Sequence, residues 1–310
     1  MSGKELKIVL LIPYFGKWPA YFSLFLKGCE ANTWMDVWFF TDCEPPSRNY
    51  SNVYFHTSSL EGFSLLASEK LGFPVQVEQP YKLCDFKPLY GKIYEDHIGD
   101  YDYWAYGDID LIYGDLMQAV YPRLKKGFDV LSFREEILSG SLVFLKNISQ
   151  VNGLLTHLPG LACMLNDSNY FGLDETCHSN ITWEGKPKSD LPKNSFTYIV
   201  NELSGEGKLQ ASFVSACKEY IYPGEVIVYK DDKLTCGQSE MAYYHFVCHK
   251  SKAEFRMPSW RSVPGEFYIT RTGFYTANQY RFLPFINSIR IFSGLLKRAA
   301  RKLRKVSTHG

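Results

Sequence analysis

The sequence predicts a single α/β domain with a mostly parallel, mixed sheet whose two faces are covered by helices. Three observations lead to this prediction. Continuous apolar runs such as residues 6–12 are typical of strands buried on both faces. These runs alternate with helix-like segments, and a strand–helix–strand alternation favours parallel pairing. A chain of 310 residues, of which 45% are apolar and 22% charged, is long enough for one large core.

The expected elements can be read in chain order. Residues 6–12 (LKIVLLI) form the first strand, and Pro13 and Gly16 end it before a helix over residues 18–30. The other elements expected in this half are strands at 37–41, 53–56, 101–107, 128–133 and 142–145, and helices at 59–71, 86–97 and 115–124.

The chain from about residue 147 is less regular and is rich in Gly, Pro, Ser and Asn. Strand-like runs return at 226–229 and 241–247, with a turn expected at Asp231 and Asp232 between them. We see no internal repeat and no linker. We therefore expect one domain over residues 1–285, with a regular half of about 1–146 and a looser half of about 147–285.

Residues 286–310 form a basic tail with seven Lys or Arg and no acidic residue. The rest of the chain holds 27 basic and 33 acidic residues, which gives it a charge of about −6. This acidic body argues against nucleic acid as a partner. Apolar residues recur in the tail at three- and four-residue spacing, which predicts an amphipathic helix for an anionic membrane surface. A charged, frayed terminus is the alternative. The apolar positions are Ile289, Phe292, Leu296, Ala299 and Leu303.

The eight cysteines are scattered and contain no Cys-x-x-Cys pair, which favours reduced thiols over a zinc site or a disulfide framework. The apolar run at 6–12 is too short for a signal peptide, and no run approaches the roughly 20 apolar residues of a membrane span. We therefore expect a cytoplasmic location.

Two Asp-x-Asp pairs flank the expected strand at 101–107. Asp100 and Asp102 precede the strand, whereas Asp108 and Asp110 follow it. Ligands of open α/β sheets bind outside the carboxyl ends of the strands, so the second pair is where a site is expected. Two carboxylates at this spacing can hold Mg²⁺ or Mn²⁺, whose charge would stabilise a departing diphosphate. The alternative is a pair of residues that cap the following helix.

A longer block around this pair carries a family resemblance. Residues 81–115 (YKLCDFKPLYGKIYEDHIGDYDYWAYGDIDLIYGD) are similar to the signature block of a bacterial family of GT-A-type glycosyltransferases of surface-polysaccharide synthesis. In that family a Tyr-Lys-x-Cys-Asp-x-Lys/Arg-Pro segment leads into a helix and then an aromatic strand that ends in Asp-x-Asp. The resemblance extends to IPYFG at 12–16, FTD at 40–42 and the stretch 139–147, and is loose in the second half.

The resemblance implies a GT-A-like (Rossmann-like) domain with a nucleotide-binding half at 1–146 and an acceptor-side half at 147–285. It implies a metal-dependent hexosyltransferase that takes a nucleotide-sugar, with a UDP-sugar as the favoured donor, and Mn²⁺ or Mg²⁺. The acceptor would be a glycan or a lipid-linked glycan of lipopolysaccharide or capsule. Such an enzyme would work on the inner face of the bacterial plasma membrane, where the basic tail would anchor it.

The resemblance also implies roles for residues of the first half. Asp108 and Asp110 would bind the metal and the diphosphate. The residues implied to contact the nucleotide are Pro13, Tyr14, Phe15, Asp42, Lys82, Asp85 and Lys87, with Asp42 on the base. A solvated surface position is the alternative for each lysine, and a helix N-cap is the alternative for Asp85.

In the second half, the resemblance implies a late histidine as third metal ligand, and a nearby lysine on the diphosphate. His245 is the best match, with His249 as the fallback, and Lys250 or Lys252 would be the lysine. A hydrogen-bonded core histidine is the alternative for His245.

The acidic pair Asp174 and Glu175 is a candidate for the acceptor side. An inverting transferase needs a carboxylate to take the proton of the attacking hydroxyl, whereas a retaining one has no such strict need here. An exposed loop pair is the alternative. The stretch 139–141 (SGS) is either a plain turn or a place where the donor sugar approaches the backbone.

Two other functions fit parts of this pattern. A sugar-phosphate nucleotidyltransferase shares the sheet and the metal chemistry, but residues 13–18 (PYFGKW) lack the Gly-rich, Arg-containing loop expected of that class. A non-catalytic glycan- or membrane-binding protein would not bind nucleotide in a metal-dependent way.

Overall fold

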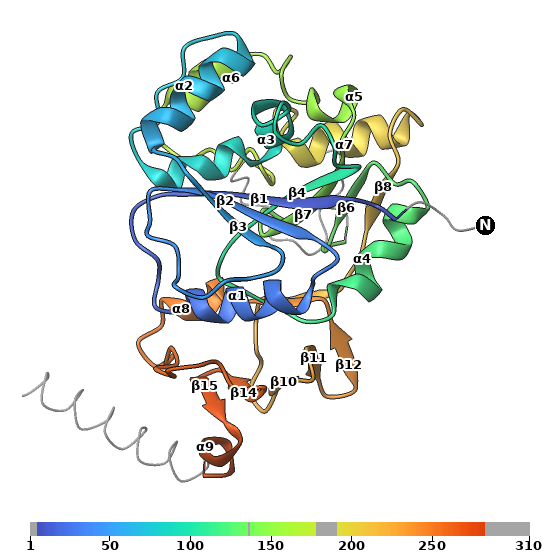
Figure 1. Cartoon of the computed structure of the whole chain (residues 1–310). Helices are drawn as coiled ribbons and strands as arrows, with labels where there is room; N and C mark the ends of the chain where they lie inside the picture. The colour runs from blue at the N-terminus through green and yellow to red at the C-terminus, as the bar shows by residue number, and fades with distance from the viewer. Residues whose placement is uncertain (1–4, 136, 178–190, 283–310) are drawn as a thin grey trace, which may run out of the picture.

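The computed structural model describes residues 5–135, 137–177 and 191–282, and its centre is a seven-stranded sheet with helices on both faces (Figure 1). This arrangement confirms the predicted α/β class. The strands are β1 Ile8–Tyr14, β2 Asp36–Thr41, β3 Val53–Thr57, β4 Tyr103–Gly107, β6 Val130–Ser132, β7 Leu142–Lys146 and β8 Ala211–Phe213. Their order across the sheet is β3-β2-β1-β4-β7-β6-β8.

The sheet is mostly parallel, as predicted. Only β7 runs against its neighbours, because it pairs antiparallel with both β4 and β6, while the other neighbouring strands are parallel. The central strand β1 is buried on both faces: Val9 and Leu11 belong to one core, and Ile8, Leu10 and Ile12 belong to the other. Successive strand side chains point to opposite faces, so a continuous apolar run is what this position requires.

Helices cover the sheet in two layers (Figure 1). One face packs on α1 Phe22–Ala31 and α4 Leu116–Lys125 through residues such as Phe25 and Val120. The opposite face packs on a longer series of short helices through residues such as Phe63 and Phe196. These helices are α2 Leu60–Leu71, a 3-10 helix at Pro80–Leu89, α3 Tyr90–Ile93, α5 Ser149–Asn152, α6 Leu161–Asn166 and α7 Phe196–Gly205.

The strand order reverses between β1 and β4. The chain passes from β1 to β2 and β3 on one side, and β4 then pairs with the other edge of β1. A reversal of this kind leaves a crevice outside the carboxyl ends of the two strands, where ligands of doubly wound sheets bind. These ends are Tyr14 of β1 and Gly107 of β4.

Two smaller sheets contain most strands of the second half of the chain, together with β5 of the first half. A three-stranded sheet has the order β5-β13-β9, with β5 Leu111–Tyr113, β13 Tyr243–His245 and β9 Cys217–Lys218. A five-stranded antiparallel sheet has the order β12-β11-β10-β14-β15. Its strands are β10 Ile227–Lys230, β11 Lys233–Cys236, β12 Ser239–Met241, β14 Glu266–Thr270 and β15 Gly273–Thr276, and the short helices nearby are α8 Val247–Lys250 and α9 Ala277–Arg281.

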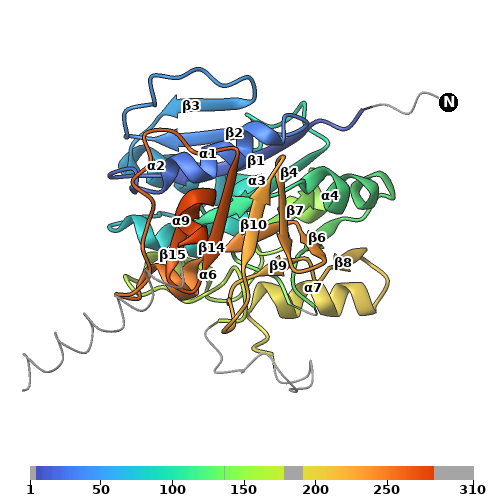
Figure 2. The same cartoon turned by 90° about the horizontal axis from the view of Figure 1, so that it is seen from below.

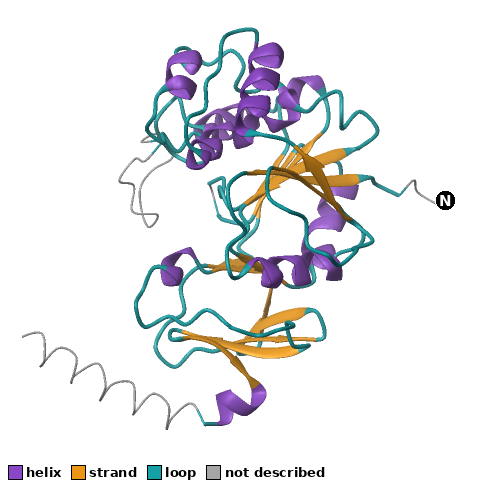
Figure 3. Ribbon diagram, turned by 60° about the vertical axis from the view of Figure 1, so that its left-hand side comes forward, coloured by secondary structure: helices purple, strands orange, loops and turns teal. Residues whose placement is uncertain are grey.

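The five-stranded sheet packs beneath α1, on the side away from the large sheet (Figures 1 and 3). Its core joins Phe267 and Phe274 of this sheet to Leu24 of α1 and Ile112 of β5. Viewed from this side, β10 and β14 lie in front of the large sheet (Figure 2). Helix α1 is therefore packed between the two sheets. Through these contacts the second half of the chain packs against the first half, about residues 1–146.

The elements of the first half agree with the predicted ones to within a few residues, with two exceptions. Strand β5 is not among the predicted strands, and at 86–97 a 3-10 helix and the short α3 replace one long helix. Pro88 lacks the amide hydrogen that a regular α-helix would use there. The turn predicted at Asp231 and Asp232 is present, and both residues have positive φ, 49° and 59°, as a type I′ hairpin turn requires. It joins β10 to β11, a strand that is not among the predicted ones.

The predicted strand at 241–247 divides in two. Met241 pairs with Leu234 in the five-stranded sheet, whereas Tyr243 pairs with Tyr113 in the three-stranded sheet, and Ala242 bends between them. One apolar run thus contributes a strand to each of two sheets. The pattern of its residues does not predict this division.

The basic tail predicted at 286–310 lies outside the described residues. Within the described part of the chain, no helix is both long enough and apolar enough to cross a membrane.

Candidate functional site

Two cavities open at the carboxyl ends of β1 and β4. The larger has a volume of about 530 Å³ and a mostly charged lining, and the smaller has about 270 Å³ and a largely apolar lining. They meet at a shared wall, which is formed by Tyr81, Cys84, Lys87, Asp108, Asp110 and Lys250. The crevice expected from the strand order is therefore a real hollow, with polar groups concentrated between its two parts.

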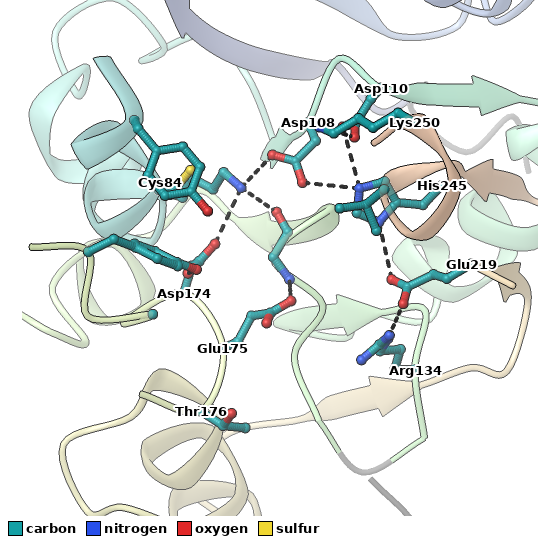
Figure 4. A pocket seen from close by; sticks show the side chains of 16 residues that line it. Cys84, Asp108, Asp110, Arg134, Asp174, Glu175, Thr176, Glu219, His245 and Lys250 are labelled. Carbon is teal, nitrogen blue, oxygen red and sulfur yellow. Dashed lines mark hydrogen bonds and ion pairs between the residues drawn. The ribbon is translucent and has the colours of Figure 1, made fainter. Parts of the chain in front are cut away.

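His245 of the larger cavity lies beside Asp108 and Asp110 of this wall (Figure 4). One ligand atom from each lies within 4.8 Å of the others. The Nε2 atom of His245 is 3.4 Å from Asp110 Oδ1 and 3.7 Å from Asp108 Oδ2. Two carboxylates and one imidazole on one side of an open cavity fit a divalent cation that keeps its remaining positions for oxygen ligands.

The three-stranded sheet brings these residues together. Strand β5 begins directly after Asp110, and β13 ends at His245, which is opposite Leu111 in the antiparallel register. The amide of Phe246 also donates to the carbonyl oxygen of Asp110, at 3.3 Å. A contact between residues 135 positions apart is thus fixed by backbone pairing, and not by side chains alone.

The charges in this cluster are strongly coupled. Burial would lower the pKa of His245, but hydrogen bonds to Asp110 and Glu219 outweigh it and raise that pKa to about 9. Burial would raise the pKa of Asp110, but His245 and Lys250 hold it well below its usual range. The Nζ atom of Lys250 is 2.7 Å from Asp110 Oδ2. The two carboxylates are therefore paired with cationic groups of the protein, and a metal ion that binds here would take the place of the His245 proton.

Lys87 links the Asp-x-Asp pair to the acidic pair of the second half. Its buried Nζ donates to Asp108 Oδ1 at 2.7 Å and to the carbonyl oxygen of Gly140 at 2.7 Å, and lies 3.3 Å from Asp174 Oδ2. Burial opposes its charge, yet Asp108 and its other neighbours raise the pKa of Lys87 well above the usual value. Lys87 lines both cavities.

Asp174 and Glu175 line the larger cavity. Asp174 is buried and accepts from the Tyr170 hydroxyl at 2.8 Å, whereas Glu175 accepts from the Gly140 amide at 2.8 Å. Burial raises the pKa of Asp174 to about 7, against the opposing charge of Lys87. A carboxyl with this pKa can take up or release a proton near neutral pH. The pair is not an exposed loop.

Gly140 is closely enclosed by the acidic pair. A Cβ atom at this position would lie 2.4 Å from Asp174 Oδ2 and 3.1 Å from the Glu175 side chain, so only glycine fits. On either side of it, the hydroxyls of Ser139 and Ser141 are 2.6 Å apart and buried. The stretch 139–141 thus brings bare backbone to the cavity.

Pro13, Tyr14 and Phe15 line the smaller cavity, where the sequence predicts contact with the nucleoside. Asp42 does not line either cavity. Its Oδ1 accepts from the amide of Gly16 at 2.8 Å, so it holds the loop that follows β1. The structure therefore offers no support for the predicted contact of Asp42 with the base.

Lys82 and Asp85 also lie outside the two cavities, so the structure offers no support for their predicted place beside the nucleotide. The Nζ of Lys82 donates to Asp85 at 2.8 Å and to the carbonyl oxygens of Met164 and Asn169 at 2.6 Å. Asp85 in turn accepts from the amides of Phe171 and Leu173. Their contacts hold the loop that leads to Asp174 in place. Lys82 is therefore not a solvated surface lysine, and Asp85 is not a helix N-cap.

The sequence leaves open the choice between His245 and His249 and the choice between Lys250 and Lys252. The positions of these side chains distinguish them. Lys250 lines both cavities, but Lys252 lies over the ring of Tyr220, 4.9 Å from its centroid. His249 is buried, with its Nδ1 3.0 Å from the Tyr244 hydroxyl, and is not part of the acidic cluster. Geometry thus favours Lys250 and His245.

Several residues of the larger cavity carry no signal in the sequence. Glu219 is the most notable, because its Oε1 is 3.1 Å from His245 Nδ1 and its Oε2 pairs with Arg134. Glu219 follows a strand of two residues, so no pattern marks it. The others are Arg134, Tyr170, Gly172, Thr176 and Val247, whereas Tyr81 and Cys84 belong to the Tyr-Lys-x-Cys-Asp segment of the resemblance.

Residues 10–278 match the model of a protein family described as "Family of unknown function (DUF6625)". No curated protein gives a significant match to the sequence. One similar solved structure is the crystal structure of mouse Xyloside xylosyltransferase 1, apo form, with a TM-score of 0.40 and 8% sequence identity over 78% of this chain and 98% of that chain.

Proposed function

This chain belongs to the DUF6625 family, and we propose that it is a metal-dependent glycosyltransferase that moves a sugar from a nucleotide-sugar to an acceptor hydroxyl. One observation carries the proposal. Asp108 and Asp110 lie on the wall between a largely apolar cavity and a charged one, at the point where the strand order reverses, and His245 lies beside them in the charged cavity. A nucleotide-sugar has this same sequence of parts: a flat base, a doubly charged diphosphate and a polar sugar.

In this proposal the nucleoside occupies the smaller cavity, against Pro13, Tyr14 and Phe15. Aromatic and apolar side chains favour a flat ring, and the volume of about 270 Å³ is near the lower end for ligand pockets. The diphosphate lies at the shared wall, where Lys250 is the cation placed to contact its oxygens. The sugar then enters the larger cavity.

A divalent cation bound here would neutralise the charge that builds up on the departing diphosphate. Asp108, Asp110 and His245 would supply its protein ligands. Lys87 fixes the orientation of the Asp108 carboxylate and adds positive charge that is already in place before the reaction, which is the usual source of electrostatic catalysis.

Asp174 and Glu175 serve the acceptor side of this proposal. As the bond between the anomeric carbon and the diphosphate oxygen breaks, a bond from the acceptor oxygen forms, and the proton of that hydroxyl passes to a carboxylate. The raised pKa of Asp174 suits this step near neutral pH. Glu175, which is held by the Gly140 amide, lies beside it.

The narrower parts of the proposal rest on the resemblance of residues 81–115. They are a UDP-sugar donor, a glycan or lipid-linked acceptor of a bacterial surface polysaccharide, and attachment to the membrane through residues 286–310. The donor can be found by offering UDP- and GDP-sugars and measuring metal-dependent hydrolysis.

A thermal-shift experiment with UDP and GDP, with and without Mn²⁺, tests the proposal. We expect one nucleotide to raise the melting temperature only when Mn²⁺ is present. Asp110→Asn should abolish this shift and the hydrolysis of the donor. Asp100→Asn is the matched control, because Asp100 belongs to the other Asp-x-Asp pair and is exposed at the opposite end of β4. Nucleotide binding that is independent of both Mn²⁺ and Asp110 would contradict the proposal.

A further inference from the structure

The three-stranded sheet aligns a third acidic residue with the metal cluster. Strand β13 pairs with β5 on one side and with β9 on the other, and Tyr244 is opposite Lys218 in the parallel register. His245, the last residue of β13, and Glu219, the first residue after β9, therefore lie at the same end of the sheet. Asp110 lies at this end too, because β5 begins just after it.

We propose that Glu219 is a positioning residue that aims the imidazole of His245 at Asp108 and Asp110, and that Arg134 holds Glu219 in place. Figure 4 shows the row from Arg134 through Glu219 and His245 to the Asp pair. This inference deepens the proposed function, since it concerns the same metal centre, but it concerns metal binding alone and not sugar transfer.

The distances assign a distinct task to each imidazole nitrogen. Nδ1 is 3.1 Å from Glu219 Oε1, whereas Nε2 faces Asp110 at 3.4 Å. Donation from Nδ1–H to the carboxylate leaves Nε2 as the nitrogen that can bind a cation between the two Asp residues. An acceptor behind the ring also prevents its rotation about the Cβ–Cγ bond. Histidine ligands of metals in proteins are commonly held in this way.

Arg134 forms an ion pair with the other carboxylate oxygen of Glu219. Its guanidinium pairs with Oε2, so that Oε1 is left for His245. Arg134 comes from the chain just after β6, and Glu219 follows β9, so the contact joins the large sheet to the small one. The side chains of both residues are only about one-fifth exposed, at 21% and 20%, which limits competition from water.

Binding of Mn²⁺ alone, measured by calorimetry on the full chain, tests this inference. Removal of a residue that orients a metal ligand typically weakens metal affinity by roughly 10–100-fold. We expect Glu219→Ala to weaken Mn²⁺ binding by about this factor. Glu219→Gln should recover a large part of the loss, because it keeps an acceptor oxygen behind the ring. A purely electrostatic role predicts equal losses for the two variants.

Glu225→Ala is the matched control. Glu225 lies on the same segment and pairs with Lys218 at 2.9 Å, but it has no contact with His245. We expect this variant to bind Mn²⁺ as the unchanged protein does. If Glu219→Ala does not fold, as judged by circular dichroism, Glu219→Leu keeps the bulk of the side chain without an acceptor and should show the same loss.

Asp110→Asn separates the two proposals. Weaker Mn²⁺ binding in Asp110→Asn together with unchanged binding in Glu219→Ala would overturn the positioning role and leave the metal site intact. Mn²⁺ binding that neither variant changes, or none in the unchanged protein, would overturn the metal site and the positioning role with it. Equal losses in the alanine and glutamine variants would also overturn the positioning role.

Discussion

Two lysines on the 3-10 helix, five residues apart, form ion pairs of similar length with very different consequences. The Lys82–Asp85 pair is 2.8 Å long, and its side chains are 3% and 0% exposed. The Lys87–Asp108 pair is 2.7 Å long, but Asp108 is 28% exposed and borders both cavities. The first pair is closed within the protein and stabilises a loop. The second pair is open to a ligand, so its charges are available for binding.

The comparison shows that the type of residue and its spacing do not decide its role. Lys82 contacts carbonyl oxygens that only the fold supplies, from Met164 and Asn169. Lys87 contacts two carboxylates that also line a cavity. A buried ion pair without access to solvent is expected to affect the stability of the fold, and one at the wall of a cavity is expected to affect function.

The largest expected effect comes from breaking the closed pair. Lys82→Met leaves Asp85 buried without its cation, which should lower the free energy of unfolding by about 3–5 kcal/mol. Urea denaturation at neutral pH measures this change. Lys92→Met is the control, because Lys92 forms an ion pair with Glu95 at the same three-residue spacing, but both side chains are about one-third exposed. Its loss should stay below about 1 kcal/mol. Equal losses would refute the distinction.

Breaking the open pair should have a smaller effect on stability and a clear effect on turnover. In Lys87→Met, Asp108 remains partly hydrated and Asp174 can take up a proton, so neither is left as a bare buried charge. Hydrolysis of the donor should fall by roughly 10²–10³-fold, the usual loss when one fixed electrostatic contact is removed. Steady-state kinetics with saturating Mn²⁺ measures it. Near-normal turnover in this variant would assign Lys87 a structural role.

A third expected effect is the dependence on pH through Asp174. Lys87, Glu175, Tyr170 and Asp108 surround this carboxyl, and burial raises its pKa to about 7. Between about pH 4 and pH 7 the folded protein therefore holds a proton that the unfolded chain, with an ordinary carboxyl pKa, has released. The free energy of unfolding should fall as the pH rises through this window and change little above it.

Transfer to an acceptor should respond to pH in the opposite direction. It needs the ionised carboxylate, so its rate should rise about tenfold per pH unit up to roughly pH 7 and then level off. Asp174→Asn should lose both the slope in stability and the rise in transfer. A rate that does not vary between pH 5 and pH 8 would exclude Asp174 as the proton acceptor and leave Glu175 for this role.

Much of the first half of the fold can be predicted from sequence because its signals are local. The apolar run of β1 and the Asp pair after β4 are each visible within a few residues, and their meeting follows from the strand order. Asp42 shows the limit of this reasoning. It directly follows β2, but its side chain accepts from the amide of Gly16 and lines neither cavity.

The rest depends on contacts between distant segments. Whether Lys82 or Lys87 reaches the cavity is decided by where the chain near residue 170 packs, which no local pattern reveals. Glu219 follows a strand of two residues and becomes recognisable only once β9 is paired with β13. His245 was suggested by resemblance alone, and its place beside Asp110 depends on the pairing of β13 with β5.

The distance along the chain between Asp110 and His245 has a consequence for the order of assembly. Asp108 and Asp110 are synthesised early, and the smaller cavity is lined almost wholly by residues up to Asp110. The imidazole and the Lys250 amine arrive together on β13 and α8, after the first hairpin of the five-stranded sheet has been synthesised. A nascent chain could thus fold its large sheet and still be unable to bind a metal ion. The ability to bind metal would be acquired in one late step of synthesis.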